Sequence, residues 1–484
     1  MTTEQKPSLL HALIPVLFLI VLLSLNVGIF GDNALSGSNQ IVLIFSATVA
    51  TIVAVLTGSN WKQLQGGIIK SISSAMGSIL ILLLIGSLAG TWLLSGIVPA
   101  MIYYGLQILN PTIFLFAATL VCAIVSIATG SSWTTAATVG IALIGIGKAL
   151  GLSEGLIAGA ILSGAYFGDK MSPLSDTTNL APAMAGTDLF THIRYMALTT
   201  IPSISIALLI FLILGFTQDT SGTVTSTNEI LAAIDNKFYI SGWLFLVPLA
   251  VVIMIIKKVD AIPALLAGTL LGAIFALIFQ SELVVEIGGS PGSTGMYIGI
   301  MKALYGEIEV ITSNAMVNDL LRSGGMAGML GTIWLILSAM VFGGVMETAG
   351  FLKVMASAII KLVNSTGSLI SSTVGTCLFF NITASDQYLA IVVPGRMYAD
   401  IYKERGLAPE NLSRSLEDSG TVTSVLVPWN TCGAYHSTVL GVSTLTYLPY
   451  CFFNIISPFM SIFYAYAGIK MKKLLNKSAE NELS

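Results

Sequence analysis

The residues that could do chemistry in this chain are acidic side chains set in short polar interruptions of long apolar segments. Asp169 and Asp176 lie in the segment 168–179, and Asp386 lies in the segment 383–387. A carboxylate near the middle of a lipid bilayer is costly, so an acidic residue found there is read as functional by default. Such a carboxylate binds either a proton or a small cation, because burial favours its protonated form and a nearby cation favours its ionised form. We expect Asp176 and Asp386 to alternate between these two states, with Asp169 as a third candidate proton carrier.

Hydroxyl and amide side chains accompany these acids in the interruptions. Gly, Ser, Thr, Asn and Pro tolerate broken helix geometry, and unwound backbone carbonyls add hard oxygen ligands of the kind that Na⁺ prefers. The side chains predicted to bind an ion or substrate are Thr129, Ser131, Ser132, Asp176, Thr177, Ser385, Asp386, Asn430 and Thr431. The subset predicted to hold Na⁺ itself is Thr129, Ser131, Asp176 and Asp386.

Some charged residues near these positions have a plainer interpretation. Asp169 stands next to Lys170, and the two could form a surface ion pair at a helix end. Glu417 and Asp418 could lie in an interfacial loop near Arg414. Exposed ion pairs contribute little to stability and need no functional role. At the level of the sequence both interpretations stay open.

The elements that must position these residues are helices that cross a lipid bilayer. Hydrophobic residues make up 55% of the 484 and charged residues only 9%, whereas soluble domains average about 25% charged residues. The segments that are long and apolar enough to cross about 30 Å of hydrocarbon are residues 9–30, 41–58, 77–97, 194–216, 239–256, 261–279, 326–346 and 447–468. The first is expected to be a retained span, since no convincing A-x-A cleavage site follows it.

Other classes of protein are disfavoured. The net charge of −3 comes with no basic patch, which argues against nucleic-acid binding. The four cysteines lie far apart without a C-x-x-C pair, and neither a Ser-His-Asp constellation nor a phosphate-binding glycine loop is found. We therefore expect neither an enzyme nor a cofactor. Broken helices would be costly and without purpose in a membrane scaffold.

The interruptions occur twice in the same order, which predicts two structural repeats. A shift of 254 residues places Thr129 on Thr383, and one further residue pairs Pro173 with Pro428. We expect an all-α polytopic membrane protein of two inverted repeats, each with a re-entrant hairpin and a discontinuous helix. The predicted parts are a first repeat at 1–217, a polar loop at 218–238, a second repeat at 239–468 and a cytoplasmic tail at 469–484.

The orientation of the chain follows from its Lys and Arg residues. If neither hairpin crosses the bilayer, each repeat crosses five times, and an odd number inverts the second repeat. Lys257, Lys258 and the lysine-rich tail then lie on the same side, as the positive-inside bias requires. Both termini are predicted to be cytoplasmic.

Three motifs closely resemble the NhaC-type Na⁺/H⁺ antiporter family, which belongs to the ion transporter superfamily. They are residues 129–135, 168–179 and 419–433, and the similarity extends over nearly the whole chain. The resemblance implies the inverted-repeat architecture with hairpins and broken helices. It also implies a lipid-embedded secondary transporter of the bacterial or archaeal cytoplasmic membrane, and a possible homodimer.

Two functions are consistent with these observations. The first is a Na⁺/H⁺ antiporter, with Na⁺ and protons as the transported ions. The alternative is a Na⁺-coupled transporter or exchanger of a small organic anion or amino acid, for example malate for lactate, because relatives with that activity resemble the same motifs. In the alternative, Arg396 could add a positive charge to the cavity.

Overall fold

The computed structural model describes residues 7–30, 34, 37–108, 110–217, 223–257, 259–312, 314–361 and 363–474. Residues 218–222 of the predicted loop and 475–484 of the predicted tail lie outside this part. Up to the predicted loop the helices are α1 (Leu9–Phe30), α2 (Ser38–Leu56), α3 (Trp61–Ser74), α4 (Met76–Leu94), α5 (Ile97–Ile108), α6 (Pro111–Thr129), α7 (Ser132–Thr135), η2 (Ala136–Gly140), α8 (Ile141–Ala149), α9 (Glu154–Met171), α10 (Asp176–Ala185) and α11 (Leu189–Thr217).

A helix also lies within the predicted loop, and the second half follows it. The elements, in order, are α12 (Thr223–Asp235), η3 (Gly242–Phe245), α13 (Leu246–Ile256), α14 (Ala261–Phe279), α15 (Ser281–Gly288), α16 (Gly292–Tyr305), β1 (Ile308–Glu309), α17 (Ala315–Leu320), β2 (Arg322–Ser323), η4 (Ala327–Met329), α18 (Leu330–Thr348), α19 (Phe351–Ile360), α20 (Thr366–Thr383), α21 (Gln387–Glu404), α22 (Pro409–Leu416), η5 (Glu417–Thr421), η6 (Ser424–Leu426), α23 (Thr431–Leu440), α24 (Thr444–Tyr447), η7 (Leu448–Tyr450) and α25 (Phe452–Tyr466). The two short strands pair in antiparallel register, with Ile308 opposite Ser323.

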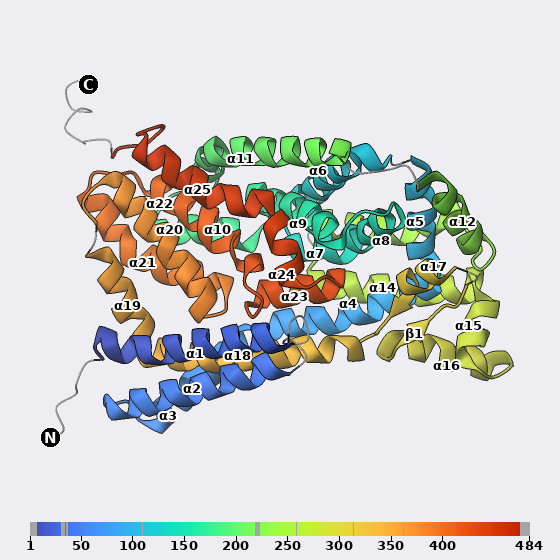
Figure 1. Ribbon diagram of the computed structural model, residues 1–484, viewed down its shortest axis with the longest axis horizontal. Coiled ribbons are helices and arrows are strands. Elements are labelled where there is room, and N and C mark those ends of the chain that lie inside the picture. Colours follow the sequence, from blue (N-terminus) through green and yellow to red (C-terminus); the bar gives the residue numbers. More distant parts are fainter. Residues whose placement is uncertain are drawn as a thin grey trace.

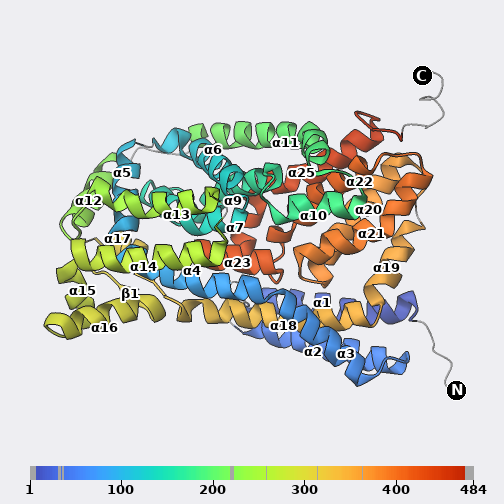
Figure 2. The same ribbon diagram turned by 180° about the vertical axis from the view of Figure 1, so that it is seen from behind.

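The helices form two outer layers around a broken interior. Figure 1 shows α11 along one long edge of the molecule and α1, α2, α3 and α18 along the opposite edge. The segments α7, α9, α10 and α23 lie between these layers, and the view from behind in Figure 2 shows the same order. The irregular backbone is thus enclosed by protein, where its polar groups can find partners.

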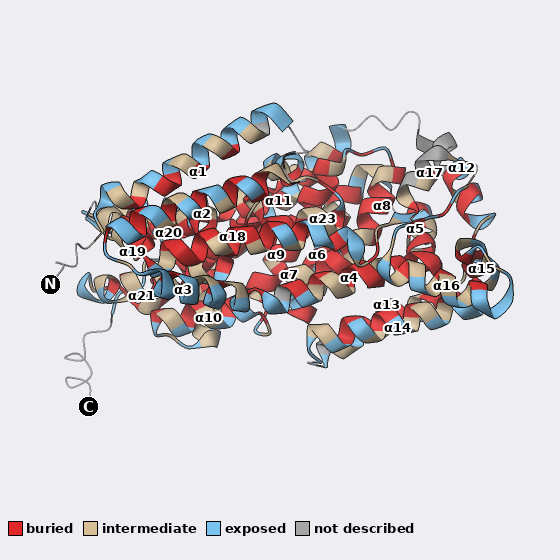
Figure 3. Cartoon of the chain, turned by 90° about the horizontal axis from the view of Figure 1, so that it is seen from below, coloured by how far each residue is buried: buried red, intermediate tan, exposed pale blue. Residues whose placement is uncertain are grey.

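The burial pattern is that of a protein whose solvent on the outside is lipid. Figure 3 shows the buried residues concentrated along the middle of the molecule. The outward faces carry large apolar side chains, such as Leu10, Leu56 and Phe216, all of which are mostly exposed. In water such faces would be an aggregation hazard, whereas hydrocarbon accommodates them.

Within the described residues, seven helices are long and apolar enough to cross a membrane, or eight if one bent pair counts as a span. Two predicted spans, 9–30 and 261–279, coincide with α1 and α14. Within the predicted span at 239–256, the helical part is the 3₁₀ turn η3 followed directly by α13, and this apolar helix is shorter than the seven full-length ones. The span at 447–468 is bent by 55° after the 3₁₀ turn η7, near whose start Pro449 lies.

The structural elements repeat along the chain. The pairs of helix starts are Pro111 and Thr366 for α6 and α20, Glu154 and Pro409 for α9 and α22, and Asp176 and Thr431 for α10 and α23. Each pair is separated by 255 positions, one more than the shift that aligned the hairpin residues in the sequence. The order of elements is therefore the same in both halves, while their inverted orientation stays a prediction.

Close packing of α6 against α9 brings the first hairpin to the first broken helix. A Cβ added to Gly164 would lie 2.1 Å from the Thr119 carbonyl oxygen, and one added to Gly168 would lie 2.4 Å from that of Ala123. Small residues four apart let two helix backbones approach in a membrane. The Ser126 hydroxyl then reaches across to the Ala165 carbonyl at 2.6 Å. This contact fixes where Asp169, one residue beyond Gly168, meets the hairpin.

Candidate functional site

The tip of the first hairpin is built around a glycine. Gly130 ends α6 with φ +70°, a conformation in which an L side chain is strained. A Cβ at this position would lie 2.6 Å from the Leu174 Cβ, so the tip rests directly on the break between α9 and α10. Ser131 then starts α7, because its hydroxyl accepts the Thr134 amide at 3.1 Å. The polar residues of the tip are thereby held against the broken helix.

Asp169 links the broken helix to this hairpin. Its Oδ2 accepts the backbone N–H of Ser132 at 3.0 Å and the Ser132 hydroxyl at 2.6 Å. Hydrogen bonds from two donors stabilise an ionised carboxylate. Asp169 is buried, and it lies on the wall of a cavity between the two segments.

A polar cavity of about 370 Å³ lies where the first hairpin, the first broken helix and the second hairpin meet. Its lining residues are Ile81, Thr129, Gly130, Ser131, Trp133, Thr134, Asp169, Leu174, Ser175, Asp176, Thr177, Val259, Asp260, Ala261, Gln387 and Tyr388. Five residues predicted from the sequence are therefore together on this wall: Thr129, Ser131, Asp169, Asp176 and Thr177. The predicted Ser132 lies behind the wall, on Asp169.

The carboxylate of Asp176 faces the open cavity. It is the first residue of α10, and it is exposed although the flanking Ser175 and Thr177 are buried. Among the described residues its carboxylate accepts one hydrogen bond, from the Tyr388 hydroxyl at 3.4 Å. Most of its lone pairs are therefore available to an ion in the cavity.

The four predicted residues of the second repeat are not on the cavity wall, because they hold their own break together. The Ser385 carbonyl accepts the Thr431 amide at 3.0 Å, and Ser385 itself has φ +59°. Asp386 caps α21 by accepting the Leu389 amide at 2.9 Å. Asn430 caps α23 and donates to the Asn381 carbonyl at 3.0 Å. Ion binding by these four residues stays a prediction.

Gln387 and Tyr388 are cavity residues that the sequence analysis did not single out. They directly follow Asp386 at the start of α21, so they were within or next to the interruption at 383–387. A polar residue one or two positions after an N-cap lies in the first turn of the helix, so its side chain can reach a cavity at that end of the helix. That signal was present in the sequence.

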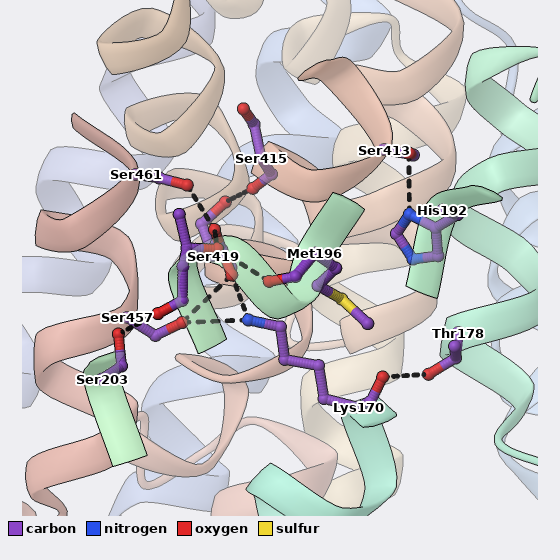
Figure 4. A network of polar contacts seen from close by, with 12 residues as sticks. Lys170, Thr178, His192, Met196, Ser203, Ser413, Ser415, Ser419, Ser457 and Ser461 are labelled. Carbon is purple, nitrogen blue, oxygen red and sulfur yellow. Dashed lines mark hydrogen bonds and ion pairs between the residues drawn. The ribbon is translucent and has the colours of Figure 1, made fainter. Parts of the chain in front are cut away.

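The plainer interpretations of two charge clusters are wrong. Lys170 is fully buried and pairs with Asp418, so neither Asp169 and Lys170 nor Glu417 and Asp418 lie at the surface. Figure 4 shows the Lys170 side chain pointing toward Ser457, whose hydroxyl is 3.1 Å from the ammonium nitrogen.

Asp418 receives several further donors from the helices around it. Its oxygens accept the Thr199 hydroxyl at 2.8 Å and the Ser457 hydroxyl at 3.2 Å, and the Ser461 hydroxyl also bonds to it. Two labelled members of this network, Ser457 and Ser461, lie on α25 in Figure 4. The ion pair thus joins α9 of the first half to η5 and α25 of the second.

Apolar membrane-crossing helices around a polar cavity walled by broken segments define a polytopic membrane transporter. The chain belongs to the Na⁺/H⁺ antiporter family, whose model matches residues 164–469. It is 37% identical to the Na⁺/H⁺ antiporter NhaC of Alkalihalophilus pseudofirmus, over 90% of this chain and 93% of that protein. It is 36% identical to the malate-2H⁺/Na⁺-lactate antiporter of Bacillus subtilis, over 97% and 96%. It is also 36% identical to the arginine/ornithine antiporter ArcD of Halobacterium salinarum, over 97% and 94%. The family resemblance drawn from the three motifs is confirmed.

Proposed function

We propose that this chain exchanges Na⁺ for protons across a bacterial or archaeal cytoplasmic membrane. The observation that carries the proposal is the cavity wall, where two carboxylates and several hydroxyls from two broken segments converge. Carboxylate, hydroxyl and carbonyl oxygens are the ligands that hard cations such as Na⁺ prefer. Membership of the Na⁺/H⁺ antiporter family supports the same exchange.

Asp169 and Asp176, the two acids that the broken helix contributes to the wall, have different tasks in this proposal. Asp169 is held by both donors of Ser132 and fixes the hairpin tip against the cavity. Asp176 carries the exchange, because its carboxylate faces the cavity with a single long hydrogen bond. Na⁺ and a proton compete for Asp176, since a carboxylate that binds one excludes the other. Access then alternates between the two sides of the membrane, as in other carriers with sites between repeats.

The decisive assay uses purified protein in liposomes that contain a pH-sensitive dye. Addition of Na⁺ outside should drive an internal pH change for the wild type and none for Asp176→Asn. Asp188→Asn is the matched control, because Asp188 is exposed and an asparagine can keep its hydrogen bond to the Thr191 amide. Wild-type exchange by Asp176→Asn would rule out Asp176 as the carrier.

A second candidate function is the exchange of Na⁺ for a cationic amino acid. The described wall of the cavity carries three acids, Asp169, Asp176 and Asp260, and no Lys or Arg. Arg396 faces a different cavity, with Lys70 and Lys353. Such a wall favours a cation over malate or lactate, and the arginine/ornithine antiporter is among the relatives. Uptake of labelled arginine into Na⁺-loaded liposomes would support this candidate, and no effect of arginine on Na⁺ flux would exclude it.

The termini and the assembly complete the proposal. Both termini face the cytoplasm, as the positive-inside bias indicates. The chain acts as a homodimer in lipid, which crosslinking of the purified protein in liposomes tests. A protease added outside right-side-out vesicles should leave both ends intact.

A further inference from the structure

Glu417 is a buried acid that the cavity does not include and the ion pair does not use. Its side chain is fully buried at the start of the π-helical segment η5. Neither of its carboxylate oxygens accepts a hydrogen bond from the described residues, and the same holds for the hydroxyl of Thr421, at the end of that segment. π-helical turns are rare and often mark functional sites.

The neighbouring Asp418 shows that this lack of partners is specific to Glu417. Asp418 takes the ammonium of Lys170 and three hydroxyl groups from the surrounding helices. The charge of Lys170 is therefore already compensated. An ionised Glu417 would be a second negative charge without a hydrogen bond in a dry interior, which is costly, so the neutral form with its proton is favoured.

The position of Glu417 connects it to the Na⁺ cavity. The helix α10, on which Thr177 lies, packs against η5, on which Glu417 and Thr421 lie. The Thr177 and Thr421 hydroxyls are near enough to the Glu417 carboxyl group to interact with it, but neither is in hydrogen-bonding geometry. Thr177 also lies on the cavity wall, and its Oγ1 is 3.2 Å from the Ser175 hydroxyl. Lys170 and Asp169 of α9 and Cys377 of α20 are among the titratable groups that act on Glu417 from packed elements.

We propose that Glu417 is a proton-carrying residue of the exchanger, separated from the Na⁺ cavity by the hydroxyl of Thr177. The inference rests on the proposed Na⁺/H⁺ exchange. When Na⁺ enters the cavity, its charge favours the ionised form of nearby acids. The O–H bond of the Glu417 carboxyl then breaks, and the proton passes through the Thr177 hydroxyl to water in the cavity. The electron pair stays on Glu417 as a carboxylate until a proton returns after Na⁺ has left.

The role of Glu417 differs from that of Asp176. Asp176 binds Na⁺ and a proton in turn, whereas Glu417 binds only the proton. Removal of the Glu417 carboxyl should therefore lower the number of protons moved per Na⁺ by one and leave Na⁺ transport in place. A structural role alone would change the amount of folded protein or the rate, but not this ratio.

Two measurements on one liposome preparation test the proposal. The first finds the opposing Na⁺ and pH gradients at which net flux stops, which gives the proton-to-sodium ratio. The second is infrared difference spectroscopy of the purified protein with and without Na⁺, which detects the C=O stretch of a protonated carboxyl. In the wild type that band should decrease on Na⁺ addition. In Glu417→Gln the decrease should be smaller, because only Asp176 still contributes to it, and the ratio should be lower by one proton. Glu404→Gln, at an exposed position on α21, should match the wild type.

The possible results distinguish a failure of this inference from a failure of the proposed function. If the wild type exchanges Na⁺ for protons but Glu417→Gln keeps both the band and the ratio, the inference is overturned and the proposed function stands. If the wild type shows no Na⁺-driven pH change, the proposed function itself fails. Should Glu417→Gln not fold, Glu417→Asp retains a carboxyl in a new position, and an unshifted infrared band in that variant would also overturn the inference.

Discussion

The ion pair between Lys170 and Asp418 should be among the most consequential charge contacts in the described part of the chain. Both side chains are fully buried. Removal of one partner from a buried pair costs about 3–5 kcal/mol, because the other charge stays in a dry interior. Lys170→Met leaves Asp418 with three hydroxyl donors, so we expect the lower end, about 3 kcal/mol. Asp418→Asn leaves the ammonium with the Ser457 hydroxyl, which places it at the upper end, about 5 kcal/mol.

The double variant Lys170→Met/Asp418→Asn buries no charge and should cost no more than Lys170→Met alone. The interaction energy in the double-mutant cycle is then at least about 5 kcal/mol in magnitude. The assay is reversible unfolding in mixed micelles with increasing fractions of a denaturing detergent, followed by circular dichroism. Lys148→Met serves as the control, because Lys148 and Glu154 form a partly exposed pair at 2.6 Å that should contribute less than about 1 kcal/mol.

Additive costs of the two single substitutions would refute this reasoning, as would a cost of Lys170→Met as small as that of Lys148→Met. Either result would mean that water reaches the pair and screens it. The charges would then no longer hold α9 against α25, and another contact would have to join the two halves there.

Two further substitutions test the cavity. Gly130→Ala should lower the apparent Na⁺ affinity, because φ +70° alone costs an alanine about 1–2 kcal/mol and the new Cβ would collide with Leu174; Gly375→Ala, in the open, is the control, and equal Na⁺ dependence in both variants would contradict the contact. Tyr388→Phe should weaken apparent Na⁺ affinity by less than about tenfold, since its 3.4 Å hydrogen bond to Asp176 contributes about 1 kcal/mol at most. Complete loss of exchange in Tyr388→Phe would show that the hydroxyl takes part directly.

The sequence predicted the class of protein and the location of the breaks well. Low charge and long apolar segments are read by counting, and α6 and α20 end at the two expected threonines, Thr129 and Thr383. A break shows in the sequence as a short run of polar residues inside an apolar segment. Such residues are placed at a break because the backbone groups that it leaves unpaired need partners nearby. The shift of 255 that pairs Pro173 with Pro428 also relates the helix starts, whereas the hairpin residues Thr129 and Thr383 are related by 254, because α20 is one residue shorter than α6.

The sequence did not predict which charges meet. Lys170 and Asp418 are 248 positions apart, and either residue alone looks like a charge at a helix end. Their pairing depends on how α9 packs against η5 and α25, which no local pattern encodes. The same holds for Tyr388, whose contact with Asp176 crosses from one half to the other. The sequence therefore predicted which residues are chemically important, whereas the contacts between them could be identified only from the three-dimensional structure.

The hydrogen bonds that the candidate ligands already make rank them by how much of each side chain is left to bind Na⁺. A side chain that caps a helix uses the same oxygen lone pairs that would bind an ion. Asn430 Oδ1 accepts the Cys432 amide at 3.0 Å and the Thr431 hydroxyl at 3.4 Å, so little of it is left for Na⁺. Asp386 uses Oδ1 for the Leu389 amide and keeps Oδ2. Asp176 does not cap a helix and faces the cavity, so it has the most lone pairs available to bind an ion. Removal of the carboxylate should therefore impair Na⁺ transport more at Asp176 than at Asp386, and substitution of Asn430 should act mainly through the stability of its break.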